Sequence, residues 1–187
     1  MGKVISITNQ KGGVGKTTTA INLGAALAMA DMRVLAVDTD AQANCTSGLG
    51  FSKGSIRKSI YSALILGEPL APLILDTELD HLKLVPADKD LAGAAVEMID
   101  LPERELVLKK LLEPVVPDFD FILIDTPPSL NILTVNGLVA AHSALIPIQC
   151  EYFALEAIAD LLDTLARVRR NFNPRLAVQG ILLTMYD

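Results

Sequence analysis

The sequence predicts an α/β fold in three layers, with a mostly parallel sheet between flanking helices. Short runs rich in Val, Ile and Leu alternate along the chain with helical patterns, which favours parallel strands joined by right-handed crossovers. A glycine-rich segment, Gly12–Gly15, joins the first apolar run to the first helical pattern. Aromatic residues make up only 4% of the chain, so the core must be aliphatic, which suits a parallel sheet buried on both faces.

Composition limits the class of protein. With 51% hydrophobic and 20% charged residues, the 187-residue chain is expected to fold as one globular domain over residues 1–187. Cys45 and Cys150 lie far apart without metal-ligand spacing, which indicates reduced thiols in a cytosolic protein. The net charge of −6 argues against a stand-alone nucleic-acid binder, because contact with phosphates needs positive charge.

The elements of the first half follow from local patterns. Lys3–Thr8 groups Val and Ile residues and predicts the first strand. Thr17–Ala30 carries no charge and is rich in Ala, so we expect a helix that is buried on most sides. Arg33–Val37 predicts a second strand. Residues 41–55 contain several glycines and predict a loop, and Ile56–Leu66 predicts a short helix.

The second half alternates in the same way. Phe121–Ile124 is an apolar run that ends at Asp125, the form of a central parallel strand. Ala154–Arg170 repeats apolar residues on one face, which predicts an amphipathic helix. Further strands are expected at Leu82–Val85, Ala144–Ile148 and Val178–Thr184, and further helices at Asp88–Met98, Pro102–Leu112 and Asn131–Ala140.

One uncharged segment resembles a membrane span only superficially. Residues 126–150 contain no Asp, Glu, Lys or Arg, but Pro127, Pro128 and Pro147 interrupt them. A spanning helix needs about 20 consecutive, predominantly apolar residues. We therefore expect a loop, a helix and a buried strand, and no association with a membrane.

The segment after the first strand has the form of a phosphate-binding loop. Its glycines let backbone N–H groups approach an anion, and the start of the next helix adds a partial positive charge. Lys16 is expected to reach the β- and γ-phosphates of a nucleotide, and the Thr17 hydroxyl to bind Mg²⁺. The predicted nucleotide-binding residues are Gly12, Gly13, Val14, Gly15, Lys16, Thr17 and Thr18.

The loop departs from the usual phosphate-loop pattern at its beginning. Gln10 stands where that pattern has a glycine six residues before the lysine, and an extra lysine, Lys11, follows it. Lys11 is either an exposed loop lysine or a positive charge that stabilises phosphoryl transfer. The chemistry of the residues leaves both interpretations open.

Carboxylates end two of the predicted strands. Asp125 is positioned to act on Mg²⁺, directly or through water, although an aspartate at a strand end also forms turns. Asp38 and Asp40 are two residues apart, so they point the same way if the strand geometry continues. The pair is predicted either to serve the metal and the attacking water, or to form a helix cap or turn.

Segments throughout the chain resemble the ParA/MinD superfamily of ATPases. Asn9–Thr18 resembles its deviant Walker A motif, Asp38–Gly50 its first switch region, and Phe121–Pro128 its Walker B strand and second switch. Pro147–Glu156 and Leu182–Asp187 resemble segments typical of ParA, so the resemblance covers essentially all of the chain. It implies the fold of a P-loop NTPase.

The resemblance also implies roles for single residues. Lys11 corresponds to the signature lysine, which reaches the ATP bound by the partner subunit of a nucleotide-sandwich dimer. Asp40 would orient the attacking water, and Asp38 would lie in the outer shell of the metal. Met185 would lie near the adenine. With Lys16 and Asp125, the expected catalytic set is Lys11, Lys16, Asp40 and Asp125, and the expected metal-binding set is Thr17, Asp38 and Asp125.

The function implied by the resemblance is that of a nucleotide switch. ATP and Mg²⁺ bind, the homodimer forms and binds DNA non-specifically, and a centromere-binding ParB-type partner stimulates slow hydrolysis to ADP. The cargo is plasmid or chromosome DNA, and the protein is cytoplasmic and associated with the nucleoid. Arg167, Arg169 and Arg170 are expected either to complement the dipole of their helix or to contact DNA phosphates.

Two departures from the family pattern favour an alternative to the ATPase function. The usual Asp-Pro-Gln-Gly-Asn run appears here with Ala41 and Ala43 in place of its Pro and Gly. Family members also continue beyond the segment that ends at Asp187, so we expect a domain truncated at its C-terminus, with weakened or lost DNA binding. The alternative is a nucleotide-binding regulatory module, or a fragment, with little or no turnover.

Overall fold

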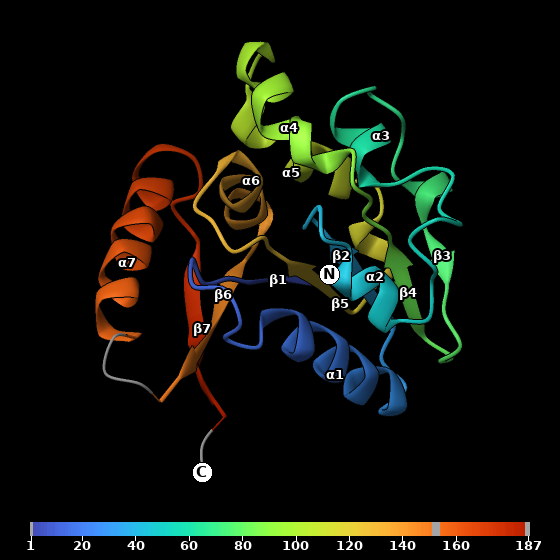
Figure 1. Cartoon of the computed structure of the whole chain (residues 1–187), viewed down its shortest axis with the longest axis horizontal. Coiled ribbons are helices and arrows are strands. Elements are labelled where there is room, and N and C mark those ends of the chain that lie inside the picture. Colours follow the sequence, from blue (N-terminus) through green and yellow to red (C-terminus); the bar gives the residue numbers. More distant parts are fainter. Residues whose placement is uncertain (1, 151–153, 186–187) are drawn as a thin grey trace.

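The computed structural model, which describes residues 2–150 and 154–185, is built around one seven-stranded sheet (Figure 1). The strand order is β3-β4-β2-β5-β1-β6-β7, and every neighbouring pair is parallel except β3 and β4. The strands are β1 (Lys3–Ile7), β2 (Val34–Asp38), β3 (Leu75–Asp76), β4 (Leu82–Val85), β5 (Phe121–Asp125), β6 (Ser143–Gln149) and β7 (Ala177–Thr184).

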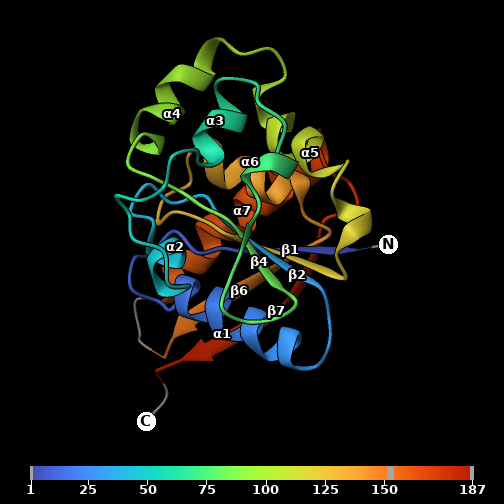
Figure 2. The ribbon, with the colours of Figure 1, turned by 90° about the vertical axis from the view of Figure 1, so that its right-hand side faces the viewer.

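Helices cover both faces of the sheet, which confirms the predicted three-layer fold. Figure 2 shows α1 on one side and α3, α4, α5 and α6 on the other. The α-helices are α1 (Lys16–Met29), α2 (Asn44–Gly48), α3 (Ile60–Leu64), α4 (Leu91–Glu97), α5 (Val107–Leu112), α6 (Ile132–Ala140) and α7 (Ala154–Asn171). Short 3-10 helices lie at Ala71–Leu73, Met98–Asp100, Arg104–Leu106 and Val116–Asp118.

The core is divided by the sheet into two aliphatic clusters. The α1 side contains Ile5, Ala20 and Leu123, and the opposite side contains buried residues of α3 to α7 together with the other face of the strands. Burial of the central strands β2 and β5 on both faces explains why their sequences read as continuous apolar runs.

In the described residues, no helix is long and apolar enough to cross a membrane.

Two predictions about the bounds of elements were wrong, and one short strand was not predicted. The expected loop at 41–55 contains the one-turn helix α2, and the two-residue strand β3 was missed, since both are too short to show a periodic pattern. The expected helix Pro102–Leu112 is a 3-10 turn followed by α5.

Helix α1 is not buried on most sides as predicted. Its fully buried apolar positions, Ala20, Gly24 and Ala28, recur every fourth residue on one face. A Cβ added to Gly24 would lie 3.3 Å from Leu82 Cδ1, so the absence of a side chain lets the helix approach the sheet closely.

The register of the sheet positions the functional residues. Asp38 at the end of β2 pairs with Asp125 at the end of β5, and Ile7 at the end of β1 also pairs with Asp125. The loop before α1 leaves from this same edge. The carboxyl ends of three adjacent central strands therefore converge where ligands bind in open α/β sheets.

His142 is hydrogen-bonded to Val4 near the start of β1. Its ring Nδ1 accepts a hydrogen bond from the backbone N–H of Val4 at 2.9 Å, and its backbone N–H donates to the Val4 carbonyl at 2.8 Å. Burial, followed by the charges of Lys3 and Lys109, lowers the pKa of His142. The folded protein therefore prefers the neutral imidazole that accepts this bond.

We expect His142→Ala to lower the free energy of unfolding by about 1–3 kcal/mol at pH 7.5, because the N–H of Val4 loses its partner. The wild type should lose stability as the pH falls below 6.5, the pKa of histidine in the unfolded state, because only the unfolded state then gains a proton. The difference in unfolding free energy between wild type and His142→Ala should therefore shrink at low pH. Urea unfolding at several pH values measures both. His81→Asn, at an exposed turn with φ +66°, should behave like wild type, and equal losses in both variants would contradict the account.

Candidate nucleotide-binding site

The loop between β1 and α1 has the backbone of an anion-binding turn. Gly13 has φ +76° and Gly15 has φ +89°, conformations that favour glycine. A Cβ at Gly13 would meet no atom within 4 Å, so the space in front of the loop is open. Gly15 is the N-cap of α1, whose first N–H groups point to the same space.

Lys16 is held beneath this loop. It is only 6% exposed, and its Nζ donates to the Lys11 carbonyl at 3.0 Å. Burial lowers its pKa, while the negative charges of Asp125 and Asp40 oppose that change. The ammonium group thus contacts the loop backbone and feels the charges of the carboxylates at the strand ends, and its expected contact with phosphates stays a prediction.

Asp125 is buried without a hydrogen-bond partner among the described residues. It is 1% exposed, and neither carboxyl oxygen makes a hydrogen bond with the residues that the structure describes. Burial, followed by the charge of Asp38, raises the pKa of Asp125 to about 7 against the opposing effect of the nearby Thr17 hydroxyl. Orphaned carboxyl oxygens next to a hydroxyl and an ammonium group fit a cation that is absent from the protein alone.

The chemistry of this donor set indicates which cation fits. Within residues 2–150 and 154–185, no group of three or more His, Cys, Asp and Glu side chains is arranged to hold a metal ion. Mg²⁺ commonly takes one or two protein oxygens and completes its shell with water and phosphate. Asp125 and Thr17 match that mode of binding rather than an all-protein cage.

Asp38, in contrast, has its oxygens engaged. It accepts hydrogen bonds from the Asp40 N–H at 3.1 Å, the Thr46 N–H at 2.8 Å and the Thr46 hydroxyl at 2.7 Å. Burial raises its pKa to about 6, and the bonds from Thr46 and Asp40 work against that rise. Asp38 therefore anchors α2 to the sheet, and its place in an outer metal shell stays a prediction.

Asp40 faces a cavity of about 270 Å³ in front of the phosphate loop. The Gln42 N–H donates to Asp40 Oδ1 at 2.9 Å, which fixes the carboxylate at the entrance of the segment leading to α2. The cavity is lined by Gly12, Gly13, Gly15, Lys16, Thr17, Thr18, Asp40, Gln42, Asn44, Pro128 and Met185.

Some of the predicted site residues line this cavity and others do not. Most of the phosphate loop, Asp40 and Met185 line it, whereas Val14 is buried behind the loop and Asp38 and Asp125 lie beneath it. Gln42 and Asn44 were not predicted as site residues. Both residues lie within two to four positions after Asp40 in the sequence, and this closeness could have indicated that they belong to the site.

The far side of the loop is hydrogen-bonded to the ends of β6 and β7. The Thr184 hydroxyl donates to the Val14 carbonyl at 2.8 Å, and Gln149 Nε2 donates to the Gly13 carbonyl at 3.2 Å. Next to this contact lies a mostly apolar hollow of about 540 Å³, lined in part by Leu23, Leu182 and Met185. Such a surface suits the flat face of a nucleotide base, and Met185 lines both hollows.

Lys11 does not line the cavity, although its backbone belongs to the loop. Its N–H donates to Asn9 Oδ1 at 2.9 Å, and Asn9 in turn donates to the Pro147 carbonyl at 2.8 Å. The neighbouring Gln10 reaches helix α7, where its Nε2 donates to Asp160 Oδ2 at 3.1 Å. The lead-in of the loop is thereby tied to β6 and α7, and the catalytic role of Lys11 stays a prediction.

The chain is similar in sequence to several known proteins. A family model described as an AAA domain matches residues 2–178. The chain is 51% identical over 187 residues to the chromosome partitioning protein ParA of Myxococcus xanthus, covering 100% of the chain and 66% of that protein. It is 49% identical to the sporulation initiation inhibitor protein Soj of Bacillus subtilis, covering 100% of the chain and 74% of that protein. The chain thus spans about two thirds to three quarters of the length of these relatives.

Solved structures agree with the fold. A cobyrinic acid a,c-diamide synthase from Mycobacterium smegmatis, with bound ATP analogue and magnesium, matches with a TM-score of 0.96 and 40% identity over 100% of this chain and 76% of that one. A plasmid partition protein from Borrelia burgdorferi matches with a TM-score of 0.87 and 27% identity, over 100% of this chain and 80% of that one.

Ala43 is strained at the start of α2. It has φ 49° and ψ 41°, the left-handed region, and is 1% exposed. We expect Ala43→Gly to change the free energy of unfolding by less than about 1 kcal/mol, because relief of strain offsets the lost methyl group. Ala28→Gly, equally buried but helical, should cost about 2 kcal/mol. Equal losses in chemical denaturation would show that Ala43 carries no strain.

Asp125 gives a prediction about pH. Its pKa rises from 3.8 to about 7 on folding, so the folded state holds the proton more tightly and the wild type loses stability as the pH rises from 4 through 7. Without Mg²⁺ or nucleotide, Asp125→Asn should be more stable than wild type by about 1–4 kcal/mol at pH 8 and equally stable near pH 4.

Urea unfolding at the two pH values measures this difference. Asp80→Asn, at an exposed position before β4, is the control and should follow wild type at both. A gain from Asp125→Asn that is equally large at pH 4 and pH 8 would contradict a buried carboxyl group with a raised pKa.

Proposed function

This chain belongs to the ParA/Soj family of partitioning ATPases, and we propose that it is an ATP-hydrolysing switch that partitions plasmid or chromosome DNA. The observation that carries the proposal is the convergence of Lys16, Thr17 and the orphaned carboxylate of Asp125 beneath an open glycine loop. That arrangement supplies positive charge, a hydroxyl ligand and a carboxylate where the phosphates and metal of a nucleotide bind.

Each residue of the site has a task in the proposed reaction. The phosphate loop would hold ATP or ADP, and Thr17 and Asp125 would hold Mg²⁺, whose chemistry is to neutralise charge on the phosphates. Lys16 stabilises negative charge on the transferred phosphoryl group, and Asp40, which faces the cavity, orients the attacking water. The Mycobacterium smegmatis relative, crystallised with an ATP analogue and magnesium, supports this ligand pair.

The wider cycle rests on the relatives. We propose that the ATP-bound chain forms a homodimer in which Lys11 contacts the nucleotide of the other subunit. The dimer would bind DNA non-specifically, and a ParB-type centromere-binding protein would stimulate its slow hydrolysis, in the cytoplasm and in association with the nucleoid. The partitioning names of relatives at about 50% identity support this cycle. The net charge of −6 predicts weak DNA binding by this chain.

A second function is favoured by one observation. Ala43 is held in a strained backbone conformation between Asp40 and α2. If that strain keeps the segment from rearranging around the nucleotide, the chain is a regulatory nucleotide-binding module with little turnover.

Steady-state ATPase assays with DNA present distinguish the two functions. We expect Asp40→Ala to lower kcat by about 100-fold or more because the water loses its orienting group. Lys11→Ala should lower kcat by about 1,000-fold or more if Lys11 supplies charge to the transition state. Both variants should still bind ATP.

Exposed residues outside the site provide matched controls. Asp80→Ala and Lys89→Ala remove the same two charge types and should keep wild-type turnover. Turnover unaffected by Asp40→Ala and Lys11→Ala would reject the ATPase proposal. ATP binding without measurable turnover by the wild type would favour the regulatory module.

A further inference from the structure

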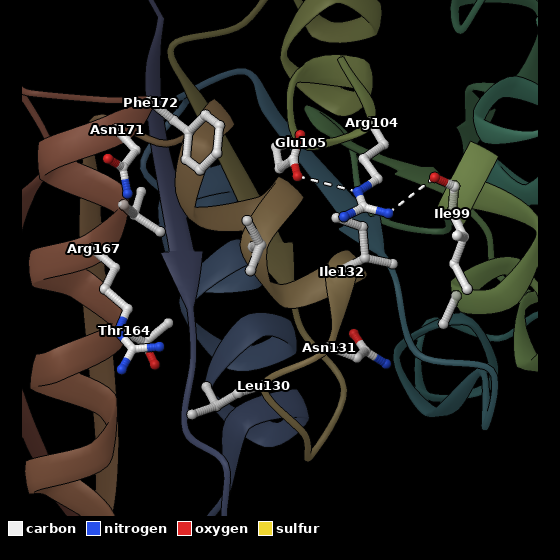
Figure 3. Close-up of a pocket in the computed structure, with 13 residues that line it drawn as sticks. Ile99, Arg104, Glu105, Leu130, Asn131, Ile132, Thr164, Arg167, Asn171 and Phe172 are labelled. Carbon is white, nitrogen blue, oxygen red and sulfur yellow. Dashed lines mark hydrogen bonds and ion pairs between the residues drawn. The ribbon is translucent and has the colours of Figure 1, made fainter. Parts of the chain in front are cut away.

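A third hollow, of about 480 Å³, lies on the side of the sheet opposite α1 (Figure 3). Helix α7 forms one wall with Thr164 and Arg167, and the start of α6 forms the floor with Ile132. The segment between α4 and α5 forms the other wall with Ile99 and Arg104. The hollow shares no lining residue with the cavity in front of the phosphate loop, so it belongs to a different site.

The two arginines of this hollow differ in their pairing. Arg104 donates to Glu105 Oε1 at 3.2 Å and to the Ile99 carbonyl at 2.9 Å, so its charge is largely compensated. Arg167 makes no hydrogen bond or ion pair with any residue in the described part of the chain (Figure 3). The α7 wall therefore presents an uncompensated guanidinium, whose planar donors match a carboxylate.

Apolar side chains surround this charge both inside and outside the hollow. Val135 and Val168 line its interior, while Ile99 and Phe172 are 55% and 37% exposed at opposite edges. A small ligand inside the hollow would leave much of this apolar edge in water. An apolar rim around a pocket is typical of a protein-binding surface, in which an anchor side chain fills the pocket and its neighbours cover the rim.

We propose that this hollow is a docking site for a segment of a partner protein that presents an apolar anchor side chain beside a carboxylate. The anchor enters between α6 and α7, and the carboxylate pairs with Arg167. Charge complementarity selects an acidic segment, since Glu105 already neutralises Arg104 and leaves Arg167 as the cation to be matched.

The position of this docking site connects it to the nucleotide site. Leu130 and Ile132, which the partner would touch, follow Asp125 along the chain and lead from its strand into α6. On the opposite wall, α7 carries both Arg167 and Asp160, and Asp160 accepts the hydrogen bond from Gln10 at the phosphate loop. A bound segment therefore contacts both the stretch of chain that follows Asp125 and the helix that is hydrogen-bonded to Gln10.

Selection of short random peptides displayed on phage, against the nucleotide-free wild-type chain, tests the proposal. We expect the enriched peptides to place Asp or Glu beside a Leu, Ile, Phe or Trp. In fluorescence anisotropy, Arg167→Met should weaken binding of the enriched synthetic peptide by about tenfold or more, because it removes the charge and keeps the apolar stem. Ile99→Glu should weaken binding similarly through repulsion and loss of the apolar rim.

Matched variants control for indirect effects. Arg170→Met, on the same helix but outside the hollow, and Val96→Glu, exposed on α4 but outside the lining, should each change binding by less than about twofold. The proposal is overturned if selection enriches no peptide or only peptides without acidic residues. It is also overturned if Arg167→Met and Arg170→Met bind equally well. Because no nucleotide is present, these outcomes do not depend on ATPase activity.

Discussion

The pairing of two buried carboxylates at adjacent strand ends is the constraint on which this site depends. Asp38 and Asp125 lie opposite each other in the sheet, both nearly inaccessible to water, and each is harder to ionise than an ordinary aspartate. Two such groups are costly in a folded core unless each is compensated. Asp38 accepts three hydrogen bonds, two of them from Thr46 of α2, whereas Asp125 accepts none from the described residues and is helped only by the nearby Thr17 hydroxyl and the charge of Lys16.

This asymmetry assigns different tasks to similar residues. The carboxylate that is satisfied by the protein holds the segment from Asp40 to Thr46 against the sheet. The carboxylate that is left without a hydrogen bond is the one that we propose binds the cation. The phosphate loop, closed at one end by Thr184 and tied at the other through Gln10 to α7, supplies the fixed frame around both.

Local chemistry made the fold and much of the site predictable. Asp125 follows a continuous apolar run and the glycines follow a strand, so each residue's place was encoded by its neighbours. The engagement of Asp38 by Thr46, the left-handed Ala43 and the docking of Thr184 on Val14 depend on contacts that form only when the sheet assembles. The hollow between α6 and α7 is a property of three separate segments, and no pattern in any one of them indicates it.

We propose that Asp125 is the buried carboxylate that binds the magnesium ion of a nucleotide. The most direct test is the affinity for ATP, measured by isothermal titration calorimetry with and without Mg²⁺, for wild type and Asp125→Asn. The account predicts that Mg²⁺ strengthens ATP binding by about tenfold or more in wild type, and has a much smaller effect in the variant. An equal effect of Mg²⁺ on both proteins, or no binding of ATP to wild type, would contradict it.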